Sequence, residues 1–107
     1  MTAVPKPVRT WVPAFLEWIR CYPCVVCVVA GQLRSPTSDP HHLRHRGAGG
    51  DDVANVVPLC RHHHREIETI GHTTFERRYG LDLWTLAAKL WATWCALPLD
   101  VREPAFG

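Results

Sequence analysis

Apolar positions in the N-terminal third of the chain alternate between helical spacing and proline-rich interruptions. Residues 14–20 carry apolar side chains at the spacing of a short helix, and Pro13 before them suits a first helical turn. Residues 24–30 form a short, mostly β-branched segment, a pattern that favours a strand or a turn wrapped round a metal. Residues 1–12 and 31–40 are broken by proline and other loop-forming residues, so both segments are predicted to be irregular.

The middle of the chain predicts a strand, a long loop, a second strand and a helix. Residues 41–44 and 56–59 favour strands, whereas residues 45–55 contain three glycines and cannot form regular structure. Residues 61–70 then have the spacing of a helix, which Gly71 would end. This order places two strands next to one helix.

The C-terminal third predicts two helices, over residues 73–79 and 82–97, which Gly80 separates. Apolar residues recur at helical spacing along the longer helix, and we interpret this face as core packing and not as a cofactor or membrane site. They are Leu83, Leu86, Ala87, Leu90, Trp91 and Trp94. Residues 98–107 are predicted to be an irregular tail. Because no internal repeat is present, we expect one domain over residues 1–107.

Composition limits the class of protein. The chain has 107 residues, of which 47% are apolar, enough for one modest core with little surplus stability. A domain stabilised by a bound metal is therefore expected. The formal net charge of +2 does not by itself indicate a nucleic-acid partner. Five arginines and six of the seven histidines, however, cluster between residues 34 and 65, so the functional site is expected there.

Two features predict the compartment. The N-terminus lacks an apolar stretch before a cleavage site, and no eighteen uncharged apolar residues run together, so we expect a soluble cytoplasmic protein without a membrane partner. Five cysteines, three of them within seven residues, suit metal binding in a reducing compartment better than a disulfide framework. Cys95, in the long apolar helix, is expected to be a buried thiol.

Two pairs of metal-ligand residues predict a structural zinc. Cys24 and Cys27 form a C-x-x-C pair, and Cys60 and His63 form a C-x-x-H pair farther along the chain. Tetrahedral zinc takes such sulfur and nitrogen ligands in pairs. A redox role for Cys21 with Cys24 is an alternative, although no βαβ pattern surrounds them, and Cys21 could also compete as a zinc ligand.

The histidines and carboxylates outside the zinc pairs predict a second metal site. Adjacent residues on a strand point to opposite sides, so one of His41 and His42 can bind a divalent ion while its neighbour faces an attacking water. His64 and Glu68 are four residues apart on the predicted helix and project from one face, whereas Glu66 projects elsewhere and ranks second. This set suits phosphodiester hydrolysis with one metal ion.

These residues stand in a longer pattern that resembles the HNH endonucleases, especially compact phage-type members and those related to the recombination-enhancement nuclease. The resemblance covers roughly residues 16–95. Its landmarks are Trp18-Ile19-Arg20, Pro23-Cys24-Val25-Val26-Cys27, Pro40-His41-His42, the glycine-rich loop up to Asp52, and Pro58-Leu59-Cys60-Arg61-His62-His63-His64. The double histidine is similar to that of the colicin nuclease domains.

The resemblance implies an α+β fold in which a small ββα-metal core, or His-Me finger, carries the zinc pairs and is flanked by an N-terminal helix and C-terminal helices. It implies that His42 is the general base, that His41 and His64 bind the catalytic metal, and that Asn55 ties the loop so that the base stays oriented. Where related sequences often have a third histidine ligand, this chain has Glu68. A carboxylate suits Mg²⁺ or Mn²⁺, with Ni²⁺ or Zn²⁺ as alternatives.

The function expected from this resemblance is that of a metal-dependent DNA endonuclease of low sequence specificity. Four arginines flank the metal residues and are expected to contact DNA phosphates: Arg44, Arg46, Arg61 and Arg65. The main alternative is a non-catalytic, zinc-stabilised module that binds nucleic acid. The oligomeric state stays open. The remaining histidines are interpreted as exposed surface residues: His45, His62 and His72.

Overall fold

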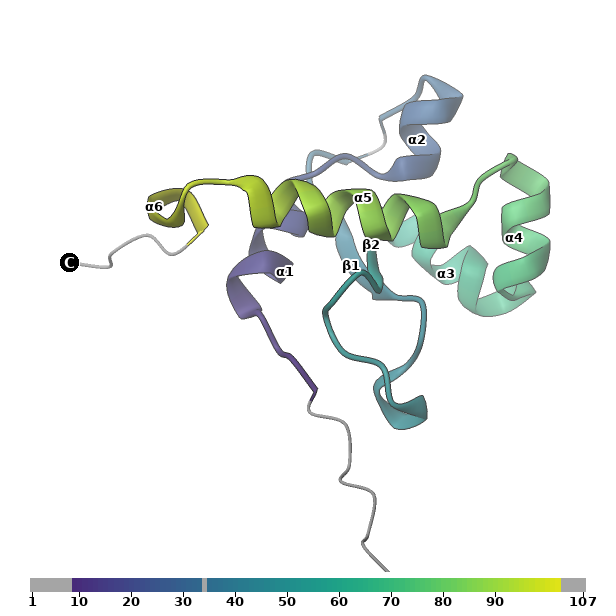
Figure 1. Cartoon of the computed structure of the whole chain (residues 1–107). Coiled ribbons are helices and arrows are strands. Elements are labelled where there is room, and N and C mark those ends of the chain that lie inside the picture. The colour runs from purple at the N-terminus through teal and green to yellow at the C-terminus, as the bar shows by residue number, and fades with distance from the viewer. Residues whose placement is uncertain (1–8, 34, 103–107) are drawn as a thin grey trace, which may run out of the picture.

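Short helices surround one small sheet in the structure, a computed structural model that describes residues 9–33 and 35–102 (Figure 1). Along the chain the elements are α1 (Pro13–Arg20), α2 (Val25–Ala30), β1 (Asp39–His42), the 3-10 turn η1 (Arg46–Ala48), β2 (Val56–Leu59), α3 (Arg61–Ile70), α4 (His72–Tyr79), α5 (Leu83–Ala96) and α6 (Leu99–Arg102). The strands and α3 follow one another in the middle of the chain, as the sequence predicts.

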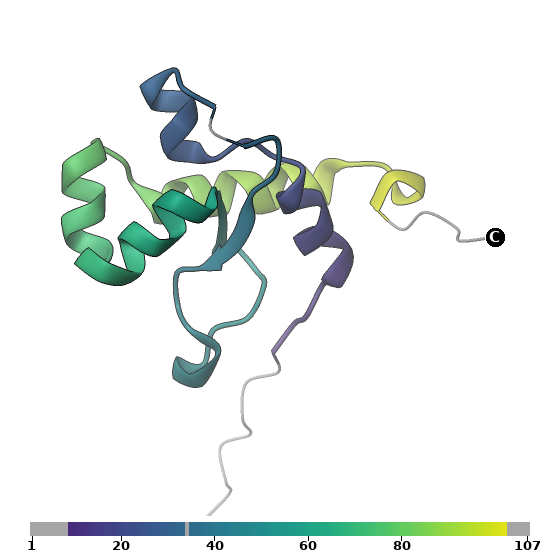
Figure 2. The same cartoon turned by 180° about the vertical axis from the view of Figure 1, so that it is seen from behind.

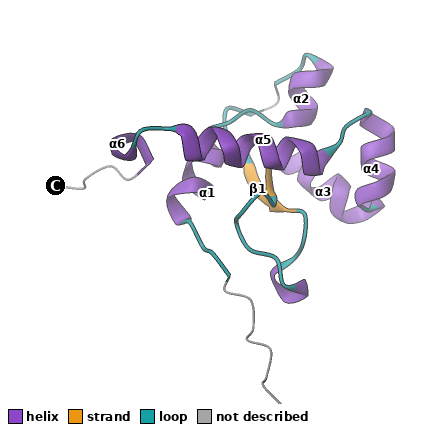
Figure 3. Cartoon of the chain, in the orientation of Figure 1, coloured by secondary structure: helices purple, strands orange, loops and turns teal. Residues whose placement is uncertain are grey.

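β1 and β2 form a two-stranded antiparallel sheet, joined by the long loop of residues 43–55. The register pairs His41 with Val57 and His42 with Val56, so the histidine pair stands opposite a fully buried part of β2. β2 is buried along its length because α1, α2, α3 and α5 all contact it. Figure 3 shows the sheet in orange within a mainly helical molecule, so the fold is mixed α and β.

α5 connects the two parts of the hydrophobic core. Leu83 and Ala87, near its start, are buried with the cysteine-bearing segments, whereas Trp94, near its end, packs with Phe15 and Ile19 of α1. The two opposite views show α5 running across the molecule beside the sheet (Figures 1 and 2). The apolar face predicted for this helix is therefore confirmed as core packing.

Most predicted element boundaries are confirmed to within one residue. β2 and α3 occupy the predicted residues, α1 begins one residue earlier at Pro13, and α4 begins one residue earlier than predicted. Asp82, predicted as the first residue of α5, is instead its N-cap, and its side chain accepts a hydrogen bond from the N–H of Thr85 at 3.1 Å. The end of α5 is likewise shortened by one residue.

The strand or turn predicted over residues 24–30 is wrong, because Val25–Ala30 form α2. One side of this helix, at Val26 and Cys27, is buried in the core, whereas Val28 and Val29 are exposed. Burial of one helical face outweighs the strand propensity of β-branched residues, which depends strongly on context. Gly31 ends the helix in the left-handed region at a φ of 70°.

The other corrections concern β1, the tail and one cysteine. β1 starts and ends two residues before the predicted strand, because Pro40 is tolerated on a strand at the edge of a sheet. Leu99–Arg102 form the short helix α6 within the tail predicted to be irregular. Cys95 was predicted to be buried but is exposed, because it lies on the outer side of α5, next to the buried Trp94.

Residues 9–12 are irregular, as predicted for the N-terminal arm, and the rest of the predicted arm and tail, residues 1–8 and 103–107, lies outside the described residues. One segment, Pro13–Ala30, is long and apolar enough to cross a membrane, with a mean hydropathy of 1.4 over 18 residues. It is weak evidence for a span, because a turn divides it into α1 and α2, both shorter than the about 20 helical residues that a span needs.

Candidate metal centres

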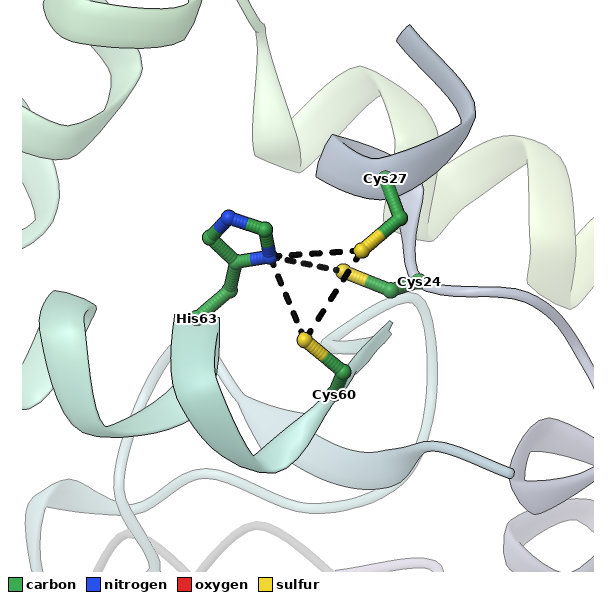
Figure 4. Close-up of side chains that lie close together, drawn as sticks. All are labelled: Cys24, Cys27, Cys60 and His63. Carbon is green, nitrogen blue, oxygen red and sulfur yellow. Dashed lines mark hydrogen bonds between the residues drawn. The ribbon is translucent and has the colours of Figure 1, made fainter. Parts of the chain in front are cut away.

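Three cysteines and a histidine meet where α2 and α3 begin (Figure 4). Cys24 is the N-cap of α2 and Cys60 is the N-cap of α3, and one helical turn farther on Cys27 and His63 point back toward the same centre. The four side chains are at most 5% exposed. The two pairs predicted from their spacing are thus brought together by the packing of α2 and α3 on the sheet.

The distances within this cluster fit a tetrahedral metal. Sγ of Cys27 lies 3.8 Å from Sγ of Cys60, and Nδ1 of His63 lies 3.4 Å from Cys24, 3.6 Å from Cys27 and 3.2 Å from Cys60. Ligands of a tetrahedral zinc, at about 2.3 Å for sulfur and about 2.0 Å for nitrogen, stand about 3.5 to 3.8 Å from one another. The donor set and its geometry therefore suit zinc.

Burial raises the pKa of the Cys24 thiol to about 11. A thiolate at this position therefore needs a compensating positive charge, which a metal ion supplies. The ring of His63 also packs edge-on against Phe75 and Tyr79. Tyr79 is held in turn, because its hydroxyl donates a hydrogen bond to Glu66. The cluster can accordingly hold a zinc ion within the core.

A second group of ligand-type side chains lies between β1 and α3. One nitrogen of His41, one nitrogen of His64 and one carboxylate oxygen of Glu68 lie within 4.8 Å of one another. Nε2 of His64 is 3.2 Å from Oε1 of Glu68, and the rings of His41 and His64 are 5.1 Å apart. These are the three residues that the sequence proposed as a second metal site, and Glu66, the second-ranked choice, instead contacts Arg78 and Tyr79.

Asp39 is a partner of this group that the sequence analysis missed. Its Oδ2 lies 3.0 Å from Nδ1 of His64 and 3.0 Å from Nε of Arg61. The hydrogen bond to His64 and the charge of Arg61 lower the pKa of the Asp39 carboxyl. With Nδ1 bound to Asp39, Nε2 of His64 is directed toward Glu68. The signal was available, because residues two apart on a strand share a face, as Asp39 and His41 do.

His41 is suited to bind a metal near neutral pH. Burial, followed by the charges of neighbouring histidines, lowers the pKa of His41 to about 4. Its imidazole is therefore neutral at pH 7 and keeps a lone pair for a metal ion. Two of the neighbours that contribute are His45 and His72, which the sequence predicts to be exposed residues without partners.

His45 and His62 are exposed, as predicted, but His72 is not. The His72 ring is half-buried and stacks on Trp84, with ring centroids 6.1 Å apart. Its Nε2 lies 3.3 Å from Oε1 of Glu76, one turn along α4. The solvated reading of His72 is therefore wrong, because the loop between α4 and α5 folds Trp84 back onto it.

His42 has a buried carboxylate partner on the long loop. Its Nε2 lies 2.8 Å from Oδ1 of Asp52, whose side chain is 1% exposed. Oδ2 of Asp52 accepts a hydrogen bond of 2.7 Å from the N–H of Val12. The N-terminal arm, the loop and β1 thus meet at this histidine. In the sequence Asp52 marks only the end of the glycine-rich loop, and its spacing does not indicate a contact with His42.

Asn55 ties the two ends of the same loop together. Its Oδ1 accepts from the N–H of Arg44 at 2.8 Å, and its Nδ2 donates to the carbonyl oxygens of Arg44 and Asp51 at 3.0 and 2.7 Å. Gly50 is needed at this crossing, because a Cβ atom there would overlap the Arg44 carbonyl. The loop-tying contacts expected of Asn55 are therefore present, beside the segment that bears Asp52.

The four arginines proposed to contact DNA lie on two separate surfaces. Arg44 lines a cavity beside the loop, and the Arg46 guanidinium lies over the Trp11 ring, 4.7 Å from its centroid. Arg61 and Arg65 line an open groove along α3, which Arg78 shares. The loop and α3 are separated in the sequence only by β2, so spacing alone did not indicate that their arginines lie on different surfaces.

These features define an α+β protein with a two-stranded sheet and a buried cysteine and histidine cluster that can bind zinc. The chain belongs to the family described as "Protein of unknown function (DUF968)", which matches residues 1–94. It is 38% identical over 80 residues to the "Uncharacterized protein YdfU" of Escherichia coli (strain K12), an alignment that covers 70% of this chain and 21% of that relative. The chain thus spans about a fifth of the relative's length. No solved structure matches the chain.

Proposed function

We propose that this chain is a metal-dependent DNA endonuclease of the HNH kind, with a ββα-metal site and a separate structural zinc. One observation carries the proposal: two neighbouring residues of β1 have different partners. His41 belongs to the three-residue cluster of metal-type ligands, and His42 contacts a buried carboxylate. A histidine with a carboxylate partner beside a set of metal ligands is the combination that hydrolytic sites use.

The two clusters suit different metals and roles. Structural zinc sites use four protein ligands, whereas catalytic sites keep a coordination position open for water or substrate. The cysteine cluster supplies four buried ligands, and the second cluster supplies three, of which Glu68 is 58% exposed. We therefore assign structural Zn²⁺ to the first cluster and Mg²⁺ or Mn²⁺ to the second. A divalent ion there would neutralise charge on the phosphate and stabilise the leaving oxygen.

His42 is the proposed general base. When Nε2 carries the proton and donates it in a hydrogen bond to Asp52, the lone pair of Nδ1 is free to accept a proton from water. Asp52 is itself held by the N–H of Val12, so it fixes the ring and stabilises the imidazolium that forms. Asn55 contributes indirectly, because it ties Arg44 to Asp51, the residue before Asp52.

DNA is the proposed substrate because two of the four arginines lie on the same helix as two residues of the metal-type cluster. Arg65 and the exposed part of Arg61 lie on α3, which also carries His64 and Glu68. Arginine binds phosphate through charge-assisted hydrogen bonds that position the backbone without reading its sequence. Low sequence specificity is therefore expected.

The test is nicking of supercoiled plasmid by zinc-loaded protein with Mg²⁺, Mn²⁺ or Ni²⁺, for wild type and His42→Ala. We expect metal-dependent nicking that falls about 10² to 10⁴-fold in His42→Ala, because general-base catalysis contributes that much. Lys89→Ala is the control, since it removes an exposed side chain of α5 that lies in neither cluster and not in the groove of α3.

Two results would count against the proposal. Equal nicking by wild type and His42→Ala would contradict the assignment of His42 as the general base and would point to a contaminating nuclease. DNA that is bound but uncut with every metal would favour the zinc-stabilised binding module instead.

A further inference from the structure

A cavity of about 360 Å³ opens beside the long loop, next to the proposed site. Arg9, Arg44, Asn55 and Trp84 line it, together with the Gly50 segment. Its volume is within the range of small-ligand pockets. Asn55 connects the cavity to the proposed site, since it is bonded to the loop residue that precedes the partner of His42.

Trp84 is the unusual part of this cavity. It lies in the first turn of α5, and its side chain is 46% exposed although the next-door Leu83 is fully buried. The indole stacks on the His72 ring at an interplanar angle of 27°, so its orientation is fixed. A fixed, exposed indole is a platform on which a flat ring can stack.

The two arginines of the cavity are available for an anion. Among residues 9–33 and 35–102, no ion pair involves Arg44 or Arg9, although Arg9 donates to the carbonyl oxygen of Arg46. Asn55 binds the backbone of Arg44 on both sides, which fixes where its side chain starts. The one carboxylate in the wall, Asp51, already accepts from the N–H groups of Thr10 and Val53.

We propose that this cavity binds one unpaired nucleotide of a DNA strand, with its base stacked on Trp84 and its phosphate held by Arg44 and Arg9. The proposal rests on the proposed nuclease function and narrows its substrate to DNA with unpaired bases, such as single strands, gaps or flaps. A base within a duplex already stacks on its neighbours and is not free to lie on an indole. Stacking tolerates any base, which agrees with low sequence specificity.

Photocrosslinking tests the position of the base directly. The zinc-loaded chain, without added Mg²⁺ or Mn²⁺, is irradiated with an oligonucleotide that carries one 5-iodouracil. The adduct is then mapped by peptide mass spectrometry. We expect an adduct at Trp84 when the iodouracil is in a single strand, and little adduct when the same base is paired. An adduct only elsewhere, or an equal adduct with the duplex, would overturn the subsite.

Binding of a fluorescein-labelled thymidine 12-mer, followed by anisotropy, tests the energetics. Trp84→Ala is expected to weaken binding about tenfold or more, and Trp84→Phe to recover most of it, because a phenyl ring still offers a face for stacking. Arg44→Ala is expected to lower the affinity and to make it depend less on salt concentration. The control is Arg77→Ala, which removes the same charge from an exposed position of α4. Thermal melting of each variant shows that it is folded.

The outcomes separate this subsite from the nuclease itself. Crosslinking at Trp84 without cleavage under any metal would support the subsite and contradict the nuclease function. In the opposite outcome, nicking depends on His42 while a folded Trp84→Ala protein binds DNA as tightly as wild type does. That result would support the nuclease function and contradict the subsite.

Discussion

The two metal-type clusters share α3 but are built in opposite ways. In the cluster of Cys24, Cys27, Cys60 and His63, all four side chains are buried and the neighbouring groups are mostly apolar. In the cluster of His41, His64 and Glu68, the side chains become more exposed in that order, and His64 is held by a carboxylate. One cluster is part of the core, and the other lies at its edge.

This difference teaches how a small domain can separate stability from chemistry. A closed set of four ligands leaves a metal nothing further to bind, so such a site can only stabilise the fold. An open set needs other residues to hold its ligands, and here the Asp39 carboxylate holds the ring of His64. Asp52 and Asn55 hold the adjacent His42 and the backbone of the long loop in the same way. Substitutions in the two regions are therefore expected to have different consequences.

The largest effect is expected from removing a buried zinc ligand. Cys60→Ser should lose the bound zinc and the cooperative thermal transition, because the free energy of binding a structural zinc, about 10 to 16 kcal/mol, is comparable to the stability of a whole domain. Circular dichroism melts and zinc analysis measure both. Cys95→Ser, at an exposed thiol outside the cluster, should leave both unchanged. A Cys60→Ser protein that melts like wild type would contradict the claim that the buried cluster stabilises the fold.

A smaller and more selective effect is expected from Asp39→Asn. The amide cannot hold the His64 ring as a carboxylate does, so affinity for Mn²⁺ should fall about 10 to 100-fold while the zinc content stays at wild type. Isothermal titration of zinc-loaded protein with Mn²⁺ measures this change. Asp100→Asn, at an exposed position in α6, is the control. Loss of zinc in Asp39→Asn would show that the clusters are coupled.

The ligands could be predicted from the sequence because their spacing is short and local. Pairs such as Cys24 with Cys27, or His64 with Glu68, face one way whenever a turn or a helix forms. Their partners could not be predicted, since the contact of Asp52 with His42 depends on how the loop returns over the sheet. The helix α2 was missed for a similar reason, because contacts from other segments decided between helix and strand.

An effect of similar size, on folding and not on metal affinity, is expected where the long loop packs against itself. Gly50→Ala should destabilise the fold by about 1 to 3 kcal/mol, because the added methyl group overlaps the Arg44 carbonyl and displaces the segment that Asn55 ties. Gly47→Ala is a matched control, since a Cβ atom there meets no atom within 4 Å. Urea unfolding of the two variants measures the difference. Equal stabilities would mean that the loop is not held at this crossing.

The central claim is that the chain has two separable metal sites, one closed and one open. Native mass spectrometry of zinc-loaded protein, before and after addition of Mn²⁺, tests it in wild type, His64→Ala and Cys60→Ser. The account predicts one zinc plus one exchangeable Mn²⁺ in wild type, only the zinc in His64→Ala, and no retained zinc in Cys60→Ser. If His64→Ala still takes up Mn²⁺ like wild type, the open site, and with it the proposed catalytic centre, is contradicted.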